Sequence, residues 1–94
     1  MPAFIMAASI NPSAKRMMTD LTHQIDESLD CFSRETVKVI DVFATLGRYD
    51  YIVVFEAPDQ SEAFRVASEI NAKGVLETET WPVIPYEDFS QLTR

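Results

Sequence analysis

Four polar residues near the middle of the chain are of types that could do chemistry: Asp41, Arg48, Tyr49 and Asp50. Asp41 lies within the apolar run VKVIDVFATL, and burial there would raise the pKa of its carboxyl and suit it to act as an acid or base in a sheet-face pocket. Tyr49 and Asp50 could orient or polarise a ligand. Asp41, Tyr49 and Asp50 are therefore the candidate catalytic residues, and Arg48, which could bind a carboxylate, is the candidate ligand-binding residue.

Each of these residues also has a structural interpretation, which we favour. Asp41 is structural if it faces water or pairs with a lysine or arginine. Asp50 can hydrogen-bond the backbone of its own turn while Tyr49 packs against neighbours. Arg48 can simply be solvated.

We predict no metal site and no cofactor. His23 is the only histidine, and although Asp20 and Glu27 share its helix face, a solvated polar face explains all three. Cys31 is the only cysteine, so no disulfide forms within the chain, and we expect a half-buried thiol. The sequence has no glycine-rich phosphate loop, Ser-His-Asp set or nucleotide fingerprint. This excludes the easily recognised enzymes but leaves open an enzyme that needs no cofactor.

The length and charge of the chain narrow the class of protein. Its 94 residues predict a single domain, residues 1–94, and its net charge of −7 argues against binding to nucleic acid or to anionic membranes. No apolar run approaches the roughly 18 residues of a transmembrane helix. The start, MPAFIMAAS, lacks the basic region of a signal peptide. We therefore expect a cytoplasmic protein.

Apolar periodicity and turn residues divide the chain into strands and helices that must position these residues. The predicted elements are a strand over 3–9, a helix over 12–32, strands over 35–46 and 51–57, a helix opened by 58–62 and ended at 73–74, a strand over 75–84, and a short helix within 85–92. Within the second helix, Asp59 and Glu62 form a capping-box-like pair, and Gly74 follows the last turn.

The chemistry of the strands predicts their order. The third strand, YIVVFEA, is apolar almost throughout and is expected to be central, whereas the fourth carries Glu77, Glu79 and Pro82, which are typical of an edge. Right-handed crossovers then give an α+β fold, a ferredoxin-like β-α-β-β-α-β sandwich with a four-stranded antiparallel sheet. In the turn before the third strand, Gly47 can adopt a positive φ without steric cost.

The stretch LGRYD followed by YIVVFEAPD, residues 46–59, closely resembles the signature of the GYD-domain family, as does TET at residues 78–80. These small α/β proteins are named for their Gly-x-Tyr-Asp turn, and the resemblance covers nearly the whole chain. It implies a ferredoxin-like fold. It does not imply an activity, because the family has no agreed biochemical function.

One face of the predicted sheet lacks a cover, because both helices pack on the other face. Strict alternation places Val39 and Phe43 on one side of the second strand and Ile40 and Val42 on the other, so neither side is polar. Monomers rarely expose an apolar face of this size. We expect a homo-oligomer, similar to a dimeric α/β-barrel, with possible room for a small apolar ligand, and the tail, residues 85–92, is the alternative cover.

Three functions follow from this pattern. The first is an oligomeric ligand-binding or accessory module without catalytic activity. The second is a cofactor-independent enzyme, an isomerase or monooxygenase acting on an apolar or aromatic compound with Asp41, Tyr49 and Asp50. The third is a subunit of a larger enzyme complex, since fold alone does not fix function.

Overall fold

The computed structural model describes residues 1–12, 21–33 and 36–94 of the chain. Its elements are β1 (Ala3–Ile10), α2 (Leu21–Leu29), the 3₁₀ turn η1 (Asp30–Phe32), β2 (Lys38–Ala44), β3 (Tyr51–Glu56), α3 (Gln60–Ala72), β4 (Leu76–Val83) and α4 (Tyr86–Leu92). Most of the first half of the predicted helix over 12–32, including Asp20, lies outside the described residues.

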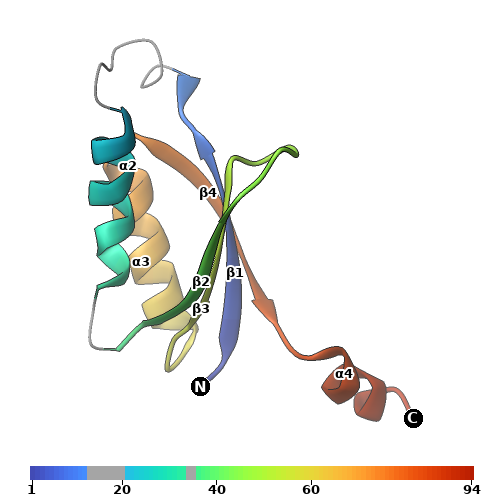
Figure 1. Cartoon of the computed structure of the whole chain (residues 1–94). Helices are drawn as coiled ribbons and strands as arrows, with labels where there is room; N and C mark the ends of the chain where they lie inside the picture. Colours follow the sequence, from blue (N-terminus) through green and yellow to red (C-terminus); the bar gives the residue numbers. More distant parts are fainter. Residues whose placement is uncertain (13–20, 34–35) are drawn as a thin grey trace.

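The four strands form one antiparallel sheet in the order β2-β3-β1-β4. The apolar β3 is internal and the charged β4 is an edge, so the predicted strand order is confirmed. Helices α2 and α3 both lie on one side of the sheet (Figure 1). The architecture is the α+β ferredoxin-like fold, and its sheet has a covered face under these helices and an outer face opposite.

The core lies between the covered face and the two helices. Phe4 and Met6 of β1 and Val53 and Phe55 of β3 are almost completely buried. The Phe55 ring lies against Phe4 and Phe32, with centroids 5.5 and 5.0 Å apart. Side chains from α3 fill the remaining space, namely Ala63, Val66 and Ile70. Alternation along β3 therefore places Val53 and Phe55 towards the helices, and Ile52 and Val54 away from them.

Both ends of α3 follow the predicted local chemistry. The Asp59 side chain accepts a hydrogen bond from the backbone N–H of Glu62 at 2.9 Å and caps the first turn. Gly74, just beyond the last turn, has a φ of 77°, the left-handed conformation that glycine adopts without steric cost. These two residues fix where the helix begins and ends.

The alternation predicted for β2 is wrong, because a bulge interrupts the strand. Its register against β3 shifts between Val39 and Asp41. As a result Val39 and Val42 both lie opposite covered-face residues of β3, and Phe43 pairs with Ile52 on the outer face. A bulge adds one residue to one strand and so moves every later side chain to the other face. The strand is also shorter than the predicted 35–46.

Helix α4 forms where the tail was predicted to be helical, but it stands away from the sheet (Figure 1). Tyr86, Phe89 and Leu92 are 79%, 51% and 76% exposed. The solvent-accessible surface of the chain, 6367 Å², exceeds the roughly 5,500 Å² expected for a compact monomer of this mass. The tail is therefore not the cover of the outer face within one chain.

Candidate binding face and the turn at its rim

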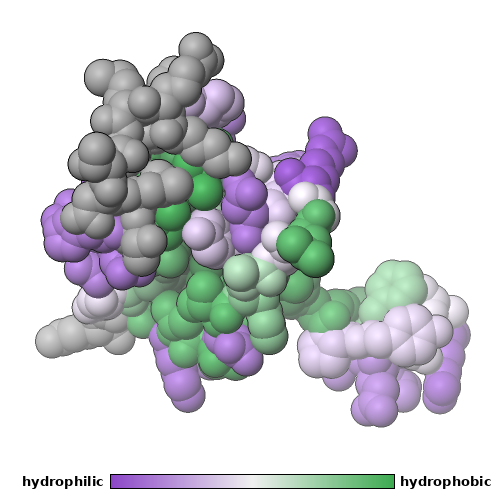
Figure 2. All heavy atoms as spheres, turned by 45° about the horizontal axis from the view of Figure 1, so that its top comes forward, coloured by the Kyte–Doolittle hydropathy of each residue, from purple (hydrophilic) through white to green (hydrophobic). Residues whose placement is uncertain are grey.

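The outer face has an apolar centre, because paired strands place apolar side chains in rows across it. One row runs from Trp81 of β4 through Ile5 and Val54 to Asp41 of β2, and the next from Glu79 through Ala7 and Ile52 to Phe43. Trp81 is 39% and Phe43 is 51% exposed. Figure 2 shows α4 set apart from the rest of the molecule at the right.

Charged and polar residues border this centre. Lys38 and Asp41 lie on the β2 edge, and Glu77 and Glu79 lie on the β4 edge. An apolar centre surrounded by a polar rim is the usual anatomy of a protein–protein interface. The outer face is thus suited to bind another protein surface.

The turn between β2 and β3 is fastened to the end of β1 by Asp50. The Asp50 side chain accepts a hydrogen bond from the backbone N–H of Ile10 at 2.8 Å, and its own N–H donates to the Ala8 carbonyl at 2.9 Å. The Asp50 carbonyl accepts from the Thr45 N–H, also at 2.9 Å, and the Thr45 hydroxyl donates to the Tyr49 carbonyl. The carboxylate therefore bonds a neighbouring strand 40 residues away, rather than its own turn.

Arg48 and Tyr49 lie at the rim of the outer face on the β4 side. The Tyr49 hydroxyl donates to the Glu79 carboxylate, and its ring meets Trp81 edge to face at a centroid distance of 6.3 Å. The Arg48 guanidinium carbon lies 5.9 Å from the centroid of the Tyr49 ring. The pKa of Tyr49 is raised, first because its hydroxyl donates to Glu79, then through desolvation and the negative charge of Glu79, against an opposing effect of Arg48.

The candidate catalytic residues do not form a single cluster. Tyr49 contacts β4 and Asp50 contacts β1, whereas Asp41 is exposed on β2, and β2 and β4 are opposite edges of the sheet. Asp41 accepts a hydrogen bond from the adjacent Val42 N–H at 3.0 Å, next to the bulge. The structure instead joins Tyr49 to Glu79 and Trp81, which no local sequence signal links to the turn.

Gly47 does not have the positive φ that its turn position suggested. Gly74 is the glycine with a positive φ. Residues 46–50 form a bend secured by Thr45 and Asp50, and these bonds hold the turn without a left-handed residue. The glycine faces open space, since an added Cβ would meet no atom within 4 Å.

The polar face of α2 carries an exposed pair, His23 Nε2 and Glu27 Oε1, 2.8 Å apart. Among the described residues, no group of three or more histidine, cysteine, aspartate or glutamate side chains is placed to hold a metal ion. Cys31 packs partly buried against the core.

None of the helices described here combines the length and apolarity required to cross a membrane.

Comparisons with known proteins agree with this architecture. The model of the GYD domain matches residues 4–93. A protein of Thermus thermophilus named "Glutamine synthetase and cystathionine beta-lyase binding protein" is 28% identical over 89 residues, covering 94% of each chain. The crystal structure of MtbAldR superposes on 89% of this chain with a TM-score of 0.64 at 19% identity. This chain spans about half, 52%, of that protein, and the similarity concerns the fold alone.

Proposed function

The chain belongs to the GYD domain family, and from this premise we propose that it is a cytoplasmic accessory protein without catalytic activity, a homo-oligomer that binds other proteins. The observation that carries the proposal is the apolar outer face, which none of the described helices covers. Its centre contains Ile5, Ile52, Val54 and Trp81. Exposed apolar patches of several hundred Å² often mark protein interaction sites.

A second copy of the chain is the first occupant of this face. Four strands about 4.8 Å apart, each six to eight residues long, make a face on the order of 20 Å by 20 to 25 Å. Stable interfaces bury about 800 Å² on each partner, which is more than such a face offers if it is flat. We expect α4 to supply the difference by laying Tyr86, Phe89 and Leu92 on the partner copy.

The partner proteins are proposed from the named relative. Glutamine synthetase and cystathionine beta-lyase appear in the name of the Thermus protein, whose length this chain matches almost completely. We propose that the oligomer docks on an enzyme of this kind through surfaces that remain open after self-association. These include the Arg48–Tyr49 turn and the acidic β4 edge.

We prefer this function to that of a cofactor-independent enzyme because the polar residues do not converge. An active site requires its acid, base and ligand-orienting groups within hydrogen-bond reach of one substrate. Asp41 lies on the β2 edge, whereas the Tyr49 side chain contacts Glu79 on the opposite edge, β4. The Asp50 carboxylate accepts a hydrogen bond from the Ile10 N–H.

Self-association is tested by placing a charge on the outer face. Val54→Asp should reduce the mass measured by light scattering to the 10.7 kDa of one chain, because a carboxylate cannot be buried in an apolar interface without a partner. Ser61→Asp adds the same charge at an exposed site on α3 and should leave the mass unchanged. A wild-type mass near 10.7 kDa at micromolar concentration would contradict the homo-oligomer.

Partner binding is tested separately with purified glutamine synthetase and cystathionine beta-lyase from the source organism. We expect one of them to bind the immobilised wild-type protein in biolayer interferometry. Arg48→Glu should weaken that binding without changing the oligomeric mass. Absence of binding to either enzyme would reject these partners, whatever the outcome for self-association.

A further inference from the structure

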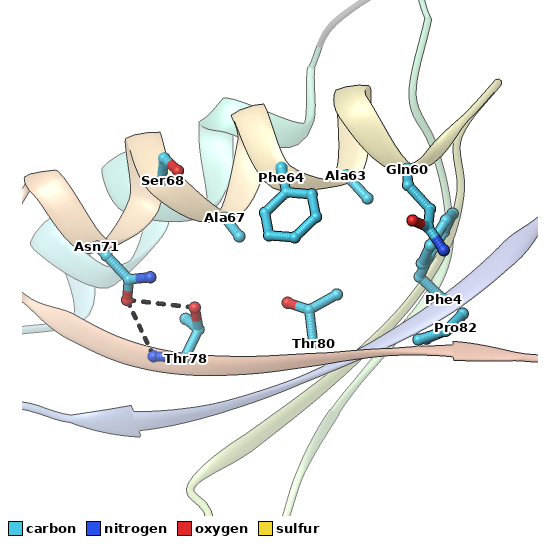
Figure 3. Close-up of a pocket in the computed structure, with 10 residues that line it drawn as sticks. All are labelled: Phe4, Gln60, Ala63, Phe64, Ala67, Ser68, Asn71, Thr78, Thr80 and Pro82. Atoms are coloured by element: carbon cyan, nitrogen blue, oxygen red, sulfur yellow. Dashed lines mark hydrogen bonds between the residues drawn. The ribbon is translucent and has the colours of Figure 1, made fainter.

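A groove of about 350 Å³ lies between α3 and β4, at the flank of the covered face (Figure 3). One wall is a stripe of α3 that runs from Gln60 at one end to Asn71 at the other, and the floor is Thr78, Thr80 and Pro82 of β4. Gln60 and Asn71 are eleven positions apart in the helix, which corresponds to roughly 16 Å along its axis. The groove is on the side of the sheet away from the outer face, so it is independent of the self-association proposed above.

The groove has no charged lining. None of its ten lining residues is aspartate, glutamate, lysine or arginine, although the chain has 15 acidic and 8 basic residues. Phe4, Phe64 and Pro82 contribute apolar surface, and Gln60 and Asn71 contribute carboxamides at the two ends. Such a site gives an anion or a cation no ionic partner, and it favours an uncharged guest.

Thr80 provides a polar group in the middle of the floor. Its hydroxyl oxygen is buried and has no hydrogen-bond partner within the part of the chain that the structure describes. A buried hydroxyl without a partner is costly, and such groups in native proteins usually bond to water or to a ligand. Figure 3 shows the Thr80 side chain directed from β4 towards Phe64 and the α3 wall.

Asn71 provides donors at one end of the groove. Its Oδ1 accepts hydrogen bonds from the Thr78 N–H at 3.0 Å and from the Thr78 hydroxyl at 3.2 Å. These bonds fix the orientation of the amide. Its nitrogen is thereby turned along the groove (Figure 3), where it can donate to the carbonyl oxygen of a guest.

The edge of β4 beside the groove is closed to an added strand. The bond to Asn71 shows that the Thr78 N–H points away from β1. Because backbone groups alternate along a strand, the backbone nitrogens of Thr80 and Pro82 point to the same free edge. Asn71 occupies the donor of the first of these three residues, and Pro82 has no N–H. Between Thr78 and Pro82 a peptide strand would therefore find one free donor, which favours a small molecule inside the groove.

We propose that this groove binds a small uncharged molecule with an apolar body and a carboxamide or similar carbonyl group. The carbonyl oxygen accepts from the Asn71 amide, and the Thr80 hydroxyl donates to or accepts from the same polar group. The apolar body packs against Phe4 and Pro82, which are cross-strand neighbours at the other end of the groove. Phe64, 72% exposed at the mouth, turns aside to admit it, since exposed side chains change rotamer within nanoseconds.

The test uses three probes of one shape: 3-phenylpropanamide, 3-phenylpropanoate and 3-phenylpropylamine, which are neutral, anionic and cationic at pH 7. Ligands of this size bind in the millimolar range, so amide chemical shifts are followed in NMR titrations to about 20 mM. The neutral amide should produce saturable shifts at Asn71, Thr78 and Thr80. The two charged probes should bind at least about tenfold more weakly.

Two nearly isosteric variants separate a binding role from a structural one. Thr80→Val should weaken the neutral probe about tenfold without reducing the thermal stability of the free protein, because the hydroxyl it removes has no partner. Asn71→Asp keeps an oxygen for Thr78 and should change the preference to the amine, which it should bind more than about tenfold better than wild type does. Thr36→Val, at an exposed threonine outside the groove, is the matched control and should bind like wild type.

Three results would overturn the proposal. One is the absence of saturable shifts with the neutral amide, and another is equal affinity for all three probes. The third is unchanged binding to Thr80→Val, which would place the bound probe elsewhere. If Asn71→Asp proves too unstable to study, the probe series on wild type and Thr80→Val still decides the question.

Discussion

The covered and outer faces of the sheet are built by the same strands from the same types of residue, yet their surroundings differ. On β3, Val53 and Phe55 are completely buried beneath the helices, whereas their neighbours Ile52 and Val54 remain half-buried on the outer face. Alternation separates two sets of side chains. Only the positions of α2 and α3 determine which set forms the core.

Apolar side chains in one sheet can thus serve two purposes. The covered face gains its burial within one chain, so its contribution to folding does not depend on concentration. The outer face can gain burial only through association, so its contribution rises with protein concentration. Substitutions on the two faces should therefore respond differently to dilution.

The largest expected difference in stability between the two faces is at two phenylalanines, one on each face. Phe55→Ala should lower the free energy of unfolding by about 3 to 5 kcal/mol, because it leaves a cavity in the core. Phe43→Ala, on the outer face and 51% exposed, should cost less than about 1 kcal/mol in the monomer. Denaturant unfolding at concentrations low enough to give monomer measures both, and equal losses would mean that the outer face is covered within one chain.

The second prediction compares the stability contributions of two aspartates, Asp50 where the turn meets β1 and Asp41 at the rim of the outer face. Asp50→Ala should cost about 1 to 3 kcal/mol, because the Ile10 N–H loses its partner in a part-buried position. Asp41→Ala, which removes an exposed carboxylate at the rim, should stay within about 0.5 kcal/mol. Chemical denaturation distinguishes them, and a large loss at Asp41 would show that this carboxylate has a partner on another copy.

The third prediction compares the two glycines, Gly47 in the turn between β2 and β3 and Gly74 between α3 and β4. Gly74→Val should destabilise by about 1 to 2 kcal/mol, because valine tolerates a φ of 77° poorly. Gly47→Val should change stability by less than about 0.5 kcal/mol, since the position is open and its φ is not positive. A larger loss at Gly47 than at Gly74 in thermal unfolding would contradict the described conformations of both loops.

The smallest expected effect concerns Tyr49 at the rim of the outer face. Its pKa in the folded protein lies above the ordinary 10.0, mainly because the hydroxyl donates to Glu79. The stability that this bond contributes is present below the unfolded-state pKa and is lost as the pH rises through the folded-state pKa. Above about pH 10, stability should therefore fall more steeply in wild type than in Tyr49→Phe, and parallel unfolding curves would show that the bond contributes nothing.

The sequence predicts the parts of this fold that depend on local chemistry. The apolar run of β3 and the charges and proline of β4 predicted the strand order, and Asp59 and Gly74 predicted both ends of α3. The bulge in β2 escaped prediction because valine and isoleucine occupy both faces there, so a shifted register leaves no polar residue out of place. The bonds of Asp50 to Ile10 and of Tyr49 to Glu79 join residues 40 and 30 positions apart, and no local pattern reports such pairs.

The bulge in β2 has a further consequence for edge-to-edge pairing of this sheet with another molecule. An exposed edge strand of valine and isoleucine residues is a template on which identical chains can stack in register. The extra residue between Val39 and Asp41 breaks the regular spacing of backbone groups along that edge. A strand of a second molecule that paired with this edge would lose the hydrogen-bond register after a few residues. Growth of the sheet by edge-to-edge addition would then stop at the bulge.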